Sequence, residues 1–340
     1  MKSKHPLIIA EMSGNHNQSL ERALAIVDAA ADAGADALKI QTYTADTMTI
    51  DVSLPGFVIE DPKSLWAGES LYSLYSRAYT PWEWHGPIFE RCRRRGIVPF
   101  STPFDASAVD FLESLDVTMY KIASFENGDI PLLEKVAATR KPVIVSLGMI
   151  GLDEIAEAVR TLEGGGCPDI TILKCTSSYP ASPENTNLLA IPDLKARFPQ
   201  CKVGLSDHTL GVGVALGAVA LGAEVIEKHF TLSRADGGVD SAFSMEPEEL
   251  RRLVEESRRV SAALGSATYE LSDAERRSLA LRRSVYVVED IEAGEVFTEA
   301  NLRCIRPGYG LHPRHYSSLL GERASVDLKR GTPMKLEYVK

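Results

Sequence analysis

Short runs of apolar and β-branched residues alternate along this chain with longer segments in which apolar residues recur every three or four positions. The alternation repeats about eight times and changes near residue 265, so it predicts parallel strands joined by helices. Segments such as Leu20–Ala33 and Pro247–Leu264 have the helical period. The predicted strands are Leu7–Met12, Ala37–Thr42, Val98–Pro103, Met119–Ser124, Pro142–Gly148, Ile170–Ser177, Val203–His208 and Val225–Thr231.

The predicted strands are apolar on both faces, which indicates that helices cover the outside of a parallel sheet. Eight such units in about 260 residues match a closed (β/α)8 TIM barrel of the α/β class. A doubly wound open sheet is the alternative. It is disfavoured because the sequence after the first strand, from Glu11 to Asn17, lacks the glycine-rich dinucleotide-binding pattern.

Two boundaries, which divide the chain into three parts, follow from changes in this pattern. We expect a barrel domain over residues 1–264, a linker with a helical piece over 265–283, and a small β-rich domain over 284–340. Inside the barrel, the segment 44–80 has no clear period, so it is either a functional cover or a misread element. A short helix is expected within it at Leu71–Ala78.

Composition and charge narrow the class of protein. Of 340 residues, 44% are hydrophobic and 25% are charged, which is typical of a globular protein with a sizeable core. The net charge is -10, and the one short basic stretch, Arg91–Arg95, would be spread around the surface of a helix, which argues against nucleic acid as a partner. A local positive pocket for a small anion is still possible in such an acidic protein. No signal peptide, membrane-spanning run or paired cysteine spacing is visible, so a reduced cytoplasm is expected.

Polar residues end nearly every predicted strand. In a barrel these ends meet at one mouth, where functional side chains gather. Caps and turns also favour Ser, Thr and Asp, but a whole ring of polar ends predicts a site. The ring consists of Glu11, Lys39, Gln41, Ser101, Thr102, Lys121, Ser124, Ser146, Lys174, Thr176, Ser177, Ser206, Asp207, His208, Lys228 and His229.

His208 and His229 end the adjacent seventh and eighth strands, so their rings should lie close together. Two imidazoles with open coordination positions suit a divalent metal such as Mn, Fe, Co or Zn. Hydrogen-bonded structural imidazoles are the alternative. From strand alternation we expect the neighbouring Glu227 and Asp207 to point outward or to act indirectly.

Lys39 and Lys121 interrupt otherwise apolar strands, where an unpaired ammonium group is costly. One interpretation is an internal salt bridge with Glu11 or Glu126. The other is binding of a phosphate or carboxylate, helped by strand-end hydroxyl groups. Phosphoenolpyruvate carries a phosphate and a carboxylate, so it suits a site made of these lysines and hydroxyl groups.

Several other side chains have two interpretations. His16 is either a ligand or general acid, or a loop residue held by its neighbours. Cys175 is expected to pack, because no His–Asp pattern accompanies it. Trp82 and Trp84 are expected to pack at a helix start, with sugar stacking as the alternative.

The whole chain resembles the sialic acid synthase family, and its C-terminal part resembles that family's antifreeze-like (SAF) domain. The likeness to the SAF domain lies in 306–311 and 331–333. The motifs of the barrel that carry the resemblance are Glu11-Met-Ser-Gly-Asn-His-Asn17, Lys39-Ile-Gln-Thr42, Ser101-Thr-Pro-Phe104, Tyr120-Lys-Ile-Ala-Ser124, Gly204-Leu-Ser-Asp-His-Thr209 and Glu227-Lys-His-Phe230.

The resemblance implies a reaction and a set of roles. C3 of phosphoenolpyruvate attacks a sugar aldehyde, water adds at C2, and phosphate leaves. It implies a metal ion, usually Mn²⁺, on His208 and His229, and a domain-swapped homodimer in which Arg306 reaches the partner's site. It also implies phosphoenolpyruvate contacts at Lys39, Thr102, Lys121, Ser124, Ser146, Ser177 and Ser206, catalytic or acid–base roles for Glu126, Tyr179 and Lys121, and a sugar contact at Asp240.

Within that family, the stretches 17–24, 41–49 and 80–85 are closer to the members that make pseudaminic acid from 2,4-diacetamido-2,4,6-trideoxy-L-altrose. Ser177 and Tyr309 replace the asparagines common in the neuraminate-forming members. Synthesis of N-acetylneuraminate or legionaminic acid is the near alternative. A non-catalytic carbohydrate-binding protein is the alternative of another class, although it would not need both the histidine pair and the buried lysines.

Overall fold

A computed structural model describes residues 5–62 and 64–340 of the chain. It contains two compact units, the first ending at Gly265 and the second comprising Ser266–Lys340. Each unit has its own hydrophobic core.

The first unit is a closed barrel of eight parallel strands, in the order in which they occur in the chain. It closes where β1 pairs with β8, with Leu7 opposite Val225 and Glu11 opposite His229. This confirms the predicted (β/α)8 barrel. The strands are β1 (Leu7–Glu11), β2 (Ala37–Thr42), β3 (Val98–Pro103), β4 (Tyr120–Ile122), β5 (Val143–Leu147), β6 (Ile170–Cys175), β7 (Lys202–Asp207) and β8 (Val225–His229).

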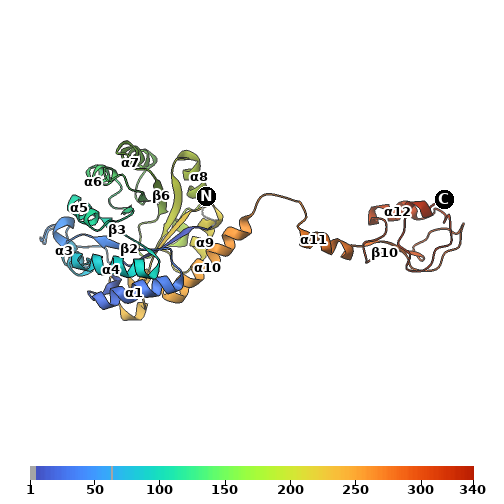
Figure 1. The fold of residues 1–340 in the computed structure, drawn as a ribbon, viewed down its shortest axis with the longest axis horizontal. Helices are drawn as coiled ribbons and strands as arrows, with labels where there is room; N and C mark the ends of the chain where they lie inside the picture. The colour runs from blue at the N-terminus through green and yellow to red at the C-terminus, as the bar shows by residue number, and fades with distance from the viewer. Residues whose placement is uncertain (1–4, 63) are drawn as a thin grey trace. The chain divides into compact units, whose positions relative to one another are not determined.

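Helices surround the strands, as Figure 1 shows for α1, α4, α5, α6 and α7. Local signals set their ends. In α1, for example, the Ser19 side chain accepts a hydrogen bond from the Arg22 N–H, and Gly34 ends the helix at a φ of 88°. The barrel unit's helices are α1 (Leu20–Ala33), α2 (Ala45–Met48), α3 (Leu71–Ala78), α4 (Trp82–Arg95), α5 (Ala106–Ser114), α6 (Ile130–Ala137), α7 (Leu152–Gly164), α8 (Ala190–Arg197), α9 (Gly213–Ala220) and α10 (Pro247–Leu264).

The inside of the barrel changes character along the strands. An apolar cluster fills its lower part, where the strands begin, and consists of Ile9, Ala37, Phe100, Ile144, Leu173 and Val225. Side chains two residues apart in a strand point to the same face. The next inward positions are polar on most strands, namely Glu11, Lys39, Thr102, Ser146, Cys175 and Glu227. This apolar cluster, hereafter the apolar plug, therefore lies beneath a layer of polar side chains at the C-terminal ends of the strands.

The described residues of the segment 44–80, hereafter the excursion, are ordered rather than structureless. It begins with α2 and ends with the expected helix α3. Between them, Val58 and Ser70 form an antiparallel bridge. The Ile59 N–H donates to the Glu69 carbonyl at 2.9 Å, and the Gly68 N–H donates to the Ile59 carbonyl at 2.8 Å. These bonds make a small hairpin next to the barrel's first loops.

The second unit contains a two-stranded antiparallel sheet of β9 (Ser284–Val287) and β10 (Leu302–Ile305), with Leu302 opposite Val287. Val285, Phe297, Leu302 and Met334 belong to its core. Helix α12 (Tyr316–Leu319) lies in this unit, and α11 (Asp273–Ser278) falls in the range predicted to be a linker. In the part of the chain that the structure describes, no helix is long and apolar enough to span a bilayer.

Candidate active site

A cavity of about 530 Å³ opens at the C-terminal ends of the barrel strands. Of the residues to which the resemblance assigns a role, all but Thr102 and Arg306 line it. Five other members of the predicted ring of polar strand ends do not line it, namely Ser101, Lys174, Thr176, Asp207 and Lys228. A second cavity, of about 690 Å³, lies at the opposite end of the strands and carries none of these residues. The predicted residues that line the first cavity are Lys39, Lys121, Ser124, Glu126, Ser146, Ser177, Tyr179, Ser206, His208, His229 and Asp240.

Lys39 on β2 lies at the floor of this cavity. Its Nζ is 2.6 Å from Glu11 Oε2 on β1 and donates to Thr102 Oγ1 at 2.9 Å. Burial raises the pKa of Glu11 to about 7, although the charge of Lys39 acts in the opposite direction. The carboxylates of Glu11 and Glu227 raise the pKa of Lys39, because their effect exceeds that of its own burial. Lys39 therefore stays a cation. Thr102 does not line the cavity itself, but it accepts a hydrogen bond from the Lys39 ammonium group that does.

Lys121 on β4 pairs with a carboxylate from the other side of the barrel. Its Nζ lies 3.2 Å from Glu227 Oε1 and donates to Ser146 Oγ at 2.7 Å, and Ser206 Oγ donates to the same Glu227 oxygen at 3.2 Å. Burial lowers the pKa of Lys121. Burial alone would raise the pKa of Glu227, but the ammonium groups of Lys121 and Lys39 outweigh it and lower that pKa.

Of the two expectations for Glu227, that it points outward or acts indirectly, the first is wrong. Residues 225, 227 and 229 alternate with 226 and 228, so Glu227 shares the inner face with His229. Asp207 does point away from the cavity, because its Oδ2 accepts from Lys228 Nζ at 2.8 Å on the outer face of the strands.

His208 and His229 lie side by side, as predicted, with ring centroids 5.3 Å apart. His208 Nδ1 lies 3.0 Å from the Thr176 carbonyl, which directs the other ring nitrogen of His208 elsewhere. His229 Nδ1 is buried and has no hydrogen-bond partner among the described residues. Burial lowers the pKa of His229 well below its ordinary value, so the ring is a neutral imidazole with a free nitrogen.

These observations suit a divalent ion that takes two ligands from this chain. Residues 5–62 and 64–340 contain no group of three His, Cys, Asp or Glu side chains arranged as a metal site. The unpaired ring nitrogen of His229, next to His208, is the kind of donor that Mn, Fe, Co and Zn accept. The remaining positions would be open to water and substrate.

Hydroxyl groups from two loops meet beside the lysines. Ser177 Oγ donates to Ser124 Oγ at 2.8 Å. Gly148 lies against both, and a Cβ there would overlap the Ser177 hydroxyl, so glycine is required for this approach. Glu126 lies on the same loop as Ser124, and burial raises the pKa of Glu126 to about 7, against the charge of Lys121. The site thus holds a carboxyl group that can carry or accept a proton near neutral pH.

Tyr179 and the histidines form an aromatic cluster. The Tyr179 ring centroid is 4.5 Å from that of His208, 5.3 Å from Phe243 and 6.2 Å from Trp66. Burial raises the pKa of the Tyr179 hydroxyl above its ordinary value, so it stays protonated. Tyr179 therefore connects the histidine pair with the excursion.

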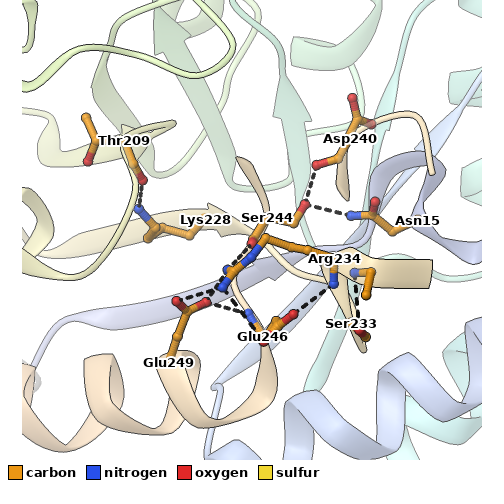
Figure 2. Close-up of polar contacts among 10 residues, drawn as sticks. Asn15, Thr209, Lys228, Ser233, Arg234, Asp240, Ser244, Glu246 and Glu249 are labelled. Carbon is orange, nitrogen blue, oxygen red and sulfur yellow. Dashed lines mark hydrogen bonds and ion pairs between the residues drawn. The ribbon is translucent and has the colours of Figure 1, made fainter. Parts of the chain in front are cut away.

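Asp240 is held in the loop after β8 by bonds from two directions. Its carboxylate accepts from the Ser13 hydroxyl and, at 3.4 Å, from the Gly14 N–H. Its carbonyl accepts from Ser244 Oγ at 2.7 Å, and Ser244 Oγ accepts from Asn15 Nδ2 at 2.8 Å, as Figure 2 shows. The aspartate is fixed at the cavity wall by the loop after β1.

Arg234 fastens the same loop to α10. Its guanidinium forms two bonds to Glu249, at 2.5 and 3.2 Å, and donates to the Ser244 carbonyl at 3.1 Å. The Arg234 N–H donates to Glu246 Oε1 at 2.8 Å, and Figure 2 shows these groups around Arg234. Arg234 thereby holds both ends of the turn that carries Asp240.

Of the other candidates, Cys175 lines the cavity, whereas His16, Trp82 and Arg306 are not among its lining residues. His16 is fully buried, its Nδ1 accepts from the Gln18 N–H, and burial lowers its pKa to about 4, so it is a structural residue. Trp82 stacks on Phe111 and donates to the Tyr43 carbonyl, which is packing. Arg306 is exposed at the end of β10 in the second unit, and its role stays a prediction.

Sequence reasoning underrated three residues of the cavity. Glu11 is in the predicted ring of polar strand ends but without a role of its own, Glu227 is expected to point outward or to act indirectly, and Trp66 has no predicted role. Counting by two from Val225 would have found Glu227, since Val225 is part of the apolar plug. Nothing in the sequence of the excursion marks Trp66.

The mouth of this closed parallel barrel holds two buried lysines, a ring of hydroxyl groups and paired imidazoles. These features are typical of barrel proteins that bind an anionic small molecule at the strand ends. The chain belongs to the NeuB family, whose model matches residues 26–269. The SAF domain model matches residues 282–337.

Individual relatives agree with this assignment. A pseudaminic acid synthase of Campylobacter jejuni is 43% identical over 98% of this chain and 96% of its own length. A pseudaminic acid synthase of Helicobacter pylori is 42% identical over 98% of both chains. N-acetylneuraminic acid synthetase from Leptospira borgpetersenii is 34% identical in sequence. Its crystal structure matches 82% of this chain and 91% of its own chain, with a TM-score of 0.72.

Proposed function

We propose that this chain is a carbon–carbon bond-forming transferase that condenses phosphoenolpyruvate with 2,4-diacetamido-2,4,6-trideoxy-L-altrose and water to give pseudaminic acid and phosphate. One observation carries the proposal: Lys39, Lys121, His208 and His229, from distant parts of the chain, line one cavity at the barrel mouth. Identity of 43% to a pseudaminic acid synthase over nearly the whole chain supports the choice of sugar.

Phosphoenolpyruvate fits the floor of the cavity by charge. The two ammonium groups already make bonds to Thr102 and Ser146, and Ser124, Ser177 and Ser206 add hydroxyl donors. A phosphate and a carboxylate accept bonds of this kind. The lysines also have internal partners: Lys39 pairs with Glu11, as the salt-bridge interpretation expected, and Lys121 pairs with Glu227 rather than with Glu126. Binding of an anion by both lysines is part of the proposal.

The reaction makes and breaks a small number of bonds. C3 of phosphoenolpyruvate bonds to the aldehyde carbon of the sugar, and the aldehyde oxygen gains a proton. Water adds its oxygen to C2 and loses a proton, and cleavage of the C2–O bond releases phosphate. Glu126, with a pKa of about 7, and the protonated Tyr179 are the groups that we assign to proton transfer.

His208 and His229 would hold the divalent ion, for which we propose Mn²⁺. When bound, such an ion acts as a Lewis acid on a carbonyl oxygen. The neutral ring of His229 and the fixed ring of His208 are the contributions of this chain.

We also propose that the working unit is a homodimer in which Arg306 of one subunit completes the site of the other. Support comes from the likeness of 306–311 to the SAF domain and from the exposure of Arg306 in the described unit. An exposed guanidinium is free to bind a sugar or carboxylate oxygen.

The decisive experiment is a panel of three sugars. The protein is incubated with phosphoenolpyruvate, Mn²⁺ and either the altrose derivative, the legionaminic acid precursor or N-acetylmannosamine, and phosphate and keto acid are measured. We expect the highest kcat/KM with the altrose derivative. Product only with N-acetylmannosamine or the legionaminic acid precursor would transfer the assignment to that synthase, and no product with any sugar would favour a binding protein.

A further inference from the structure

We propose that the excursion selects for a sugar without a 6-hydroxyl group, through an apolar wall made by Ile59, Trp66, Leu71 and Leu74. This inference rests on the proposed function, because it concerns the sugar side of the same cavity. All four side chains line the cavity whose floor holds the lysines and histidines. The cavity therefore has a charged floor from the strand ends and these four largely apolar side chains from one inserted segment, which also contributes the hydroxyl groups of Ser64 and Tyr75 elsewhere in the lining.

The wall offers no free hydrogen-bonding group from these four side chains. Three of them are hydrocarbons, and the single polar atom of the fourth, Trp66 Nε1, already donates to the Val239 carbonyl at 3.1 Å. A methyl group placed there is removed from water at no polar cost. A hydroxyl placed against these four side chains loses its water partners without gaining new ones from them.

The wall is held in place by contacts outside the cavity. Arg77 on α3 forms two bonds to Glu69 of the hairpin, at 2.8 and 2.7 Å. Gln18, in the loop after β1, donates to the carbonyls of Arg77 and Tyr79 at 3.0 and 2.7 Å. A wall fixed before the substrate arrives can discriminate, because it cannot rearrange cheaply to satisfy a misplaced hydroxyl.

The bond from Trp66 to Val239 places the wall beside the predicted sugar contact. Val239 directly precedes Asp240, and both line the cavity. The Trp66 ring also lies 6.2 Å from that of Tyr179. The apolar wall thus adjoins polar groups that can bind the remaining oxygens and amides of the same sugar.

A 2,4-diacetamido-2,4,6-trideoxy sugar has the matching chemistry. It presents the C6 methyl group and two acetamido methyl groups, where other hexoses present hydroxyls. A hydrophobic pocket rejects a substrate that adds one hydroxyl by roughly a hundredfold at most. We expect the wild-type protein to prefer the 6-deoxy altrose derivative over its 6-hydroxy counterpart by about ten- to a hundredfold in kcat/KM.

The test compares these two sugars, which differ in one oxygen atom, in three variants. Ile59→Thr and Leu71→Asn each place a polar atom on the wall at half-buried positions. Leu54→Asn is the matched control, because Leu54 lies in the excursion, is 59% exposed and does not line the cavity. We expect the preference to fall by about threefold or more in the first two variants and to stay in the control.

An unchanged KM for phosphoenolpyruvate identifies variants that are folded and have an intact floor. If such variants keep the full preference for the 6-deoxy sugar, the wall does not select and the inference is overturned. A wild-type protein that uses both altrose sugars equally well overturns it too. A wild-type protein that uses neither, but uses N-acetylmannosamine, refutes the proposed function instead.

Discussion

Lys121 and Glu227 face each other across the inside of the barrel, with 3.2 Å between Nζ and Oε1 and side chains that are 2% and 6% exposed. They come from β4 and β8, which are not neighbours in the sheet. The pair therefore exists only because the sheet closes, and it lies in the cavity where phosphoenolpyruvate is proposed to bind.

Glu227→Gln should destabilise the protein and nearly abolish turnover. It leaves the Lys121 ammonium buried with only hydroxyl partners, and breaking a buried pair costs about 3–5 kcal/mol. Urea unfolding measures the free energy of unfolding. The double variant Lys121→Met with Glu227→Gln should recover part of the loss, and a double variant as unstable as the sum of the two single variants would contradict an ion pair.

Glu126→Gln should change how stability depends on pH. The folded pKa of Glu126 is about 7, above its ordinary value of 4.5, so the folded protein binds this proton more tightly than the unfolded chain. Its stabilising contribution is full below pH 4.5 and is lost as the pH rises through about 7. Between pH 5 and 8, the free energy of unfolding of the wild type should fall by up to about 3 kcal/mol more than that of Glu126→Gln.

Parallel urea titrations at the two pH values give this difference directly, and the comparison with the variant cancels the contribution of Glu11, which titrates in the same range. Identical pH profiles for wild type and variant would show that Glu126 ionises normally.

Chelation should abolish turnover, and His208→Ala should not regain it at ordinary Mn²⁺ concentrations. Two imidazoles are the protein ligands expected, so losing one leaves too few to retain the ion. Electron paramagnetic resonance of added Mn²⁺ measures binding independently of activity. His16→Gln, outside the cavity, is the control for histidine loss, and full activity after exhaustive chelation would remove the metal from the proposal.

Arg234→Gln should weaken the use of the sugar more than that of phosphoenolpyruvate. Arg234 touches no cavity residue by its side chain, but it holds the turn that carries Asp240. A displaced Asp240 should lower kcat/KM for the sugar about ten- to a hundredfold while the KM for phosphoenolpyruvate stays constant. Arg251→Gln, which removes an exposed pair on α10, should change neither value.

Mixing Arg306→Ala with Lys121→Met should restore activity through hybrid dimers. Half of randomly mixed dimers are hybrids and each has one intact site, so about a quarter of wild-type activity is expected. Mixed subunits with distinguishable tags allow the hybrids to be purified and assayed. Inactive hybrids would show that Arg306 does not serve the site of its partner.

The barrel was predictable because its strands and helices are local. Helices α1 and α10 begin and end at the predicted residues, since periodicity and the Ser19 and Gly34 caps are readable in the chain itself. The ring of polar strand ends was predictable for the same reason, because a parallel barrel places all these ends at one mouth.

Partners across the barrel and on the excursion were not predictable. The sequence alone determined which strand ends are polar and that His208 and His229 end neighbouring strands. Only the closed tertiary structure decided that Glu227 pairs with Lys121, and that Trp66 reaches Val239, 173 residues away in sequence. Such contacts depend on strand stagger and on how an inserted segment packs, and neither leaves a periodic signal in the chain.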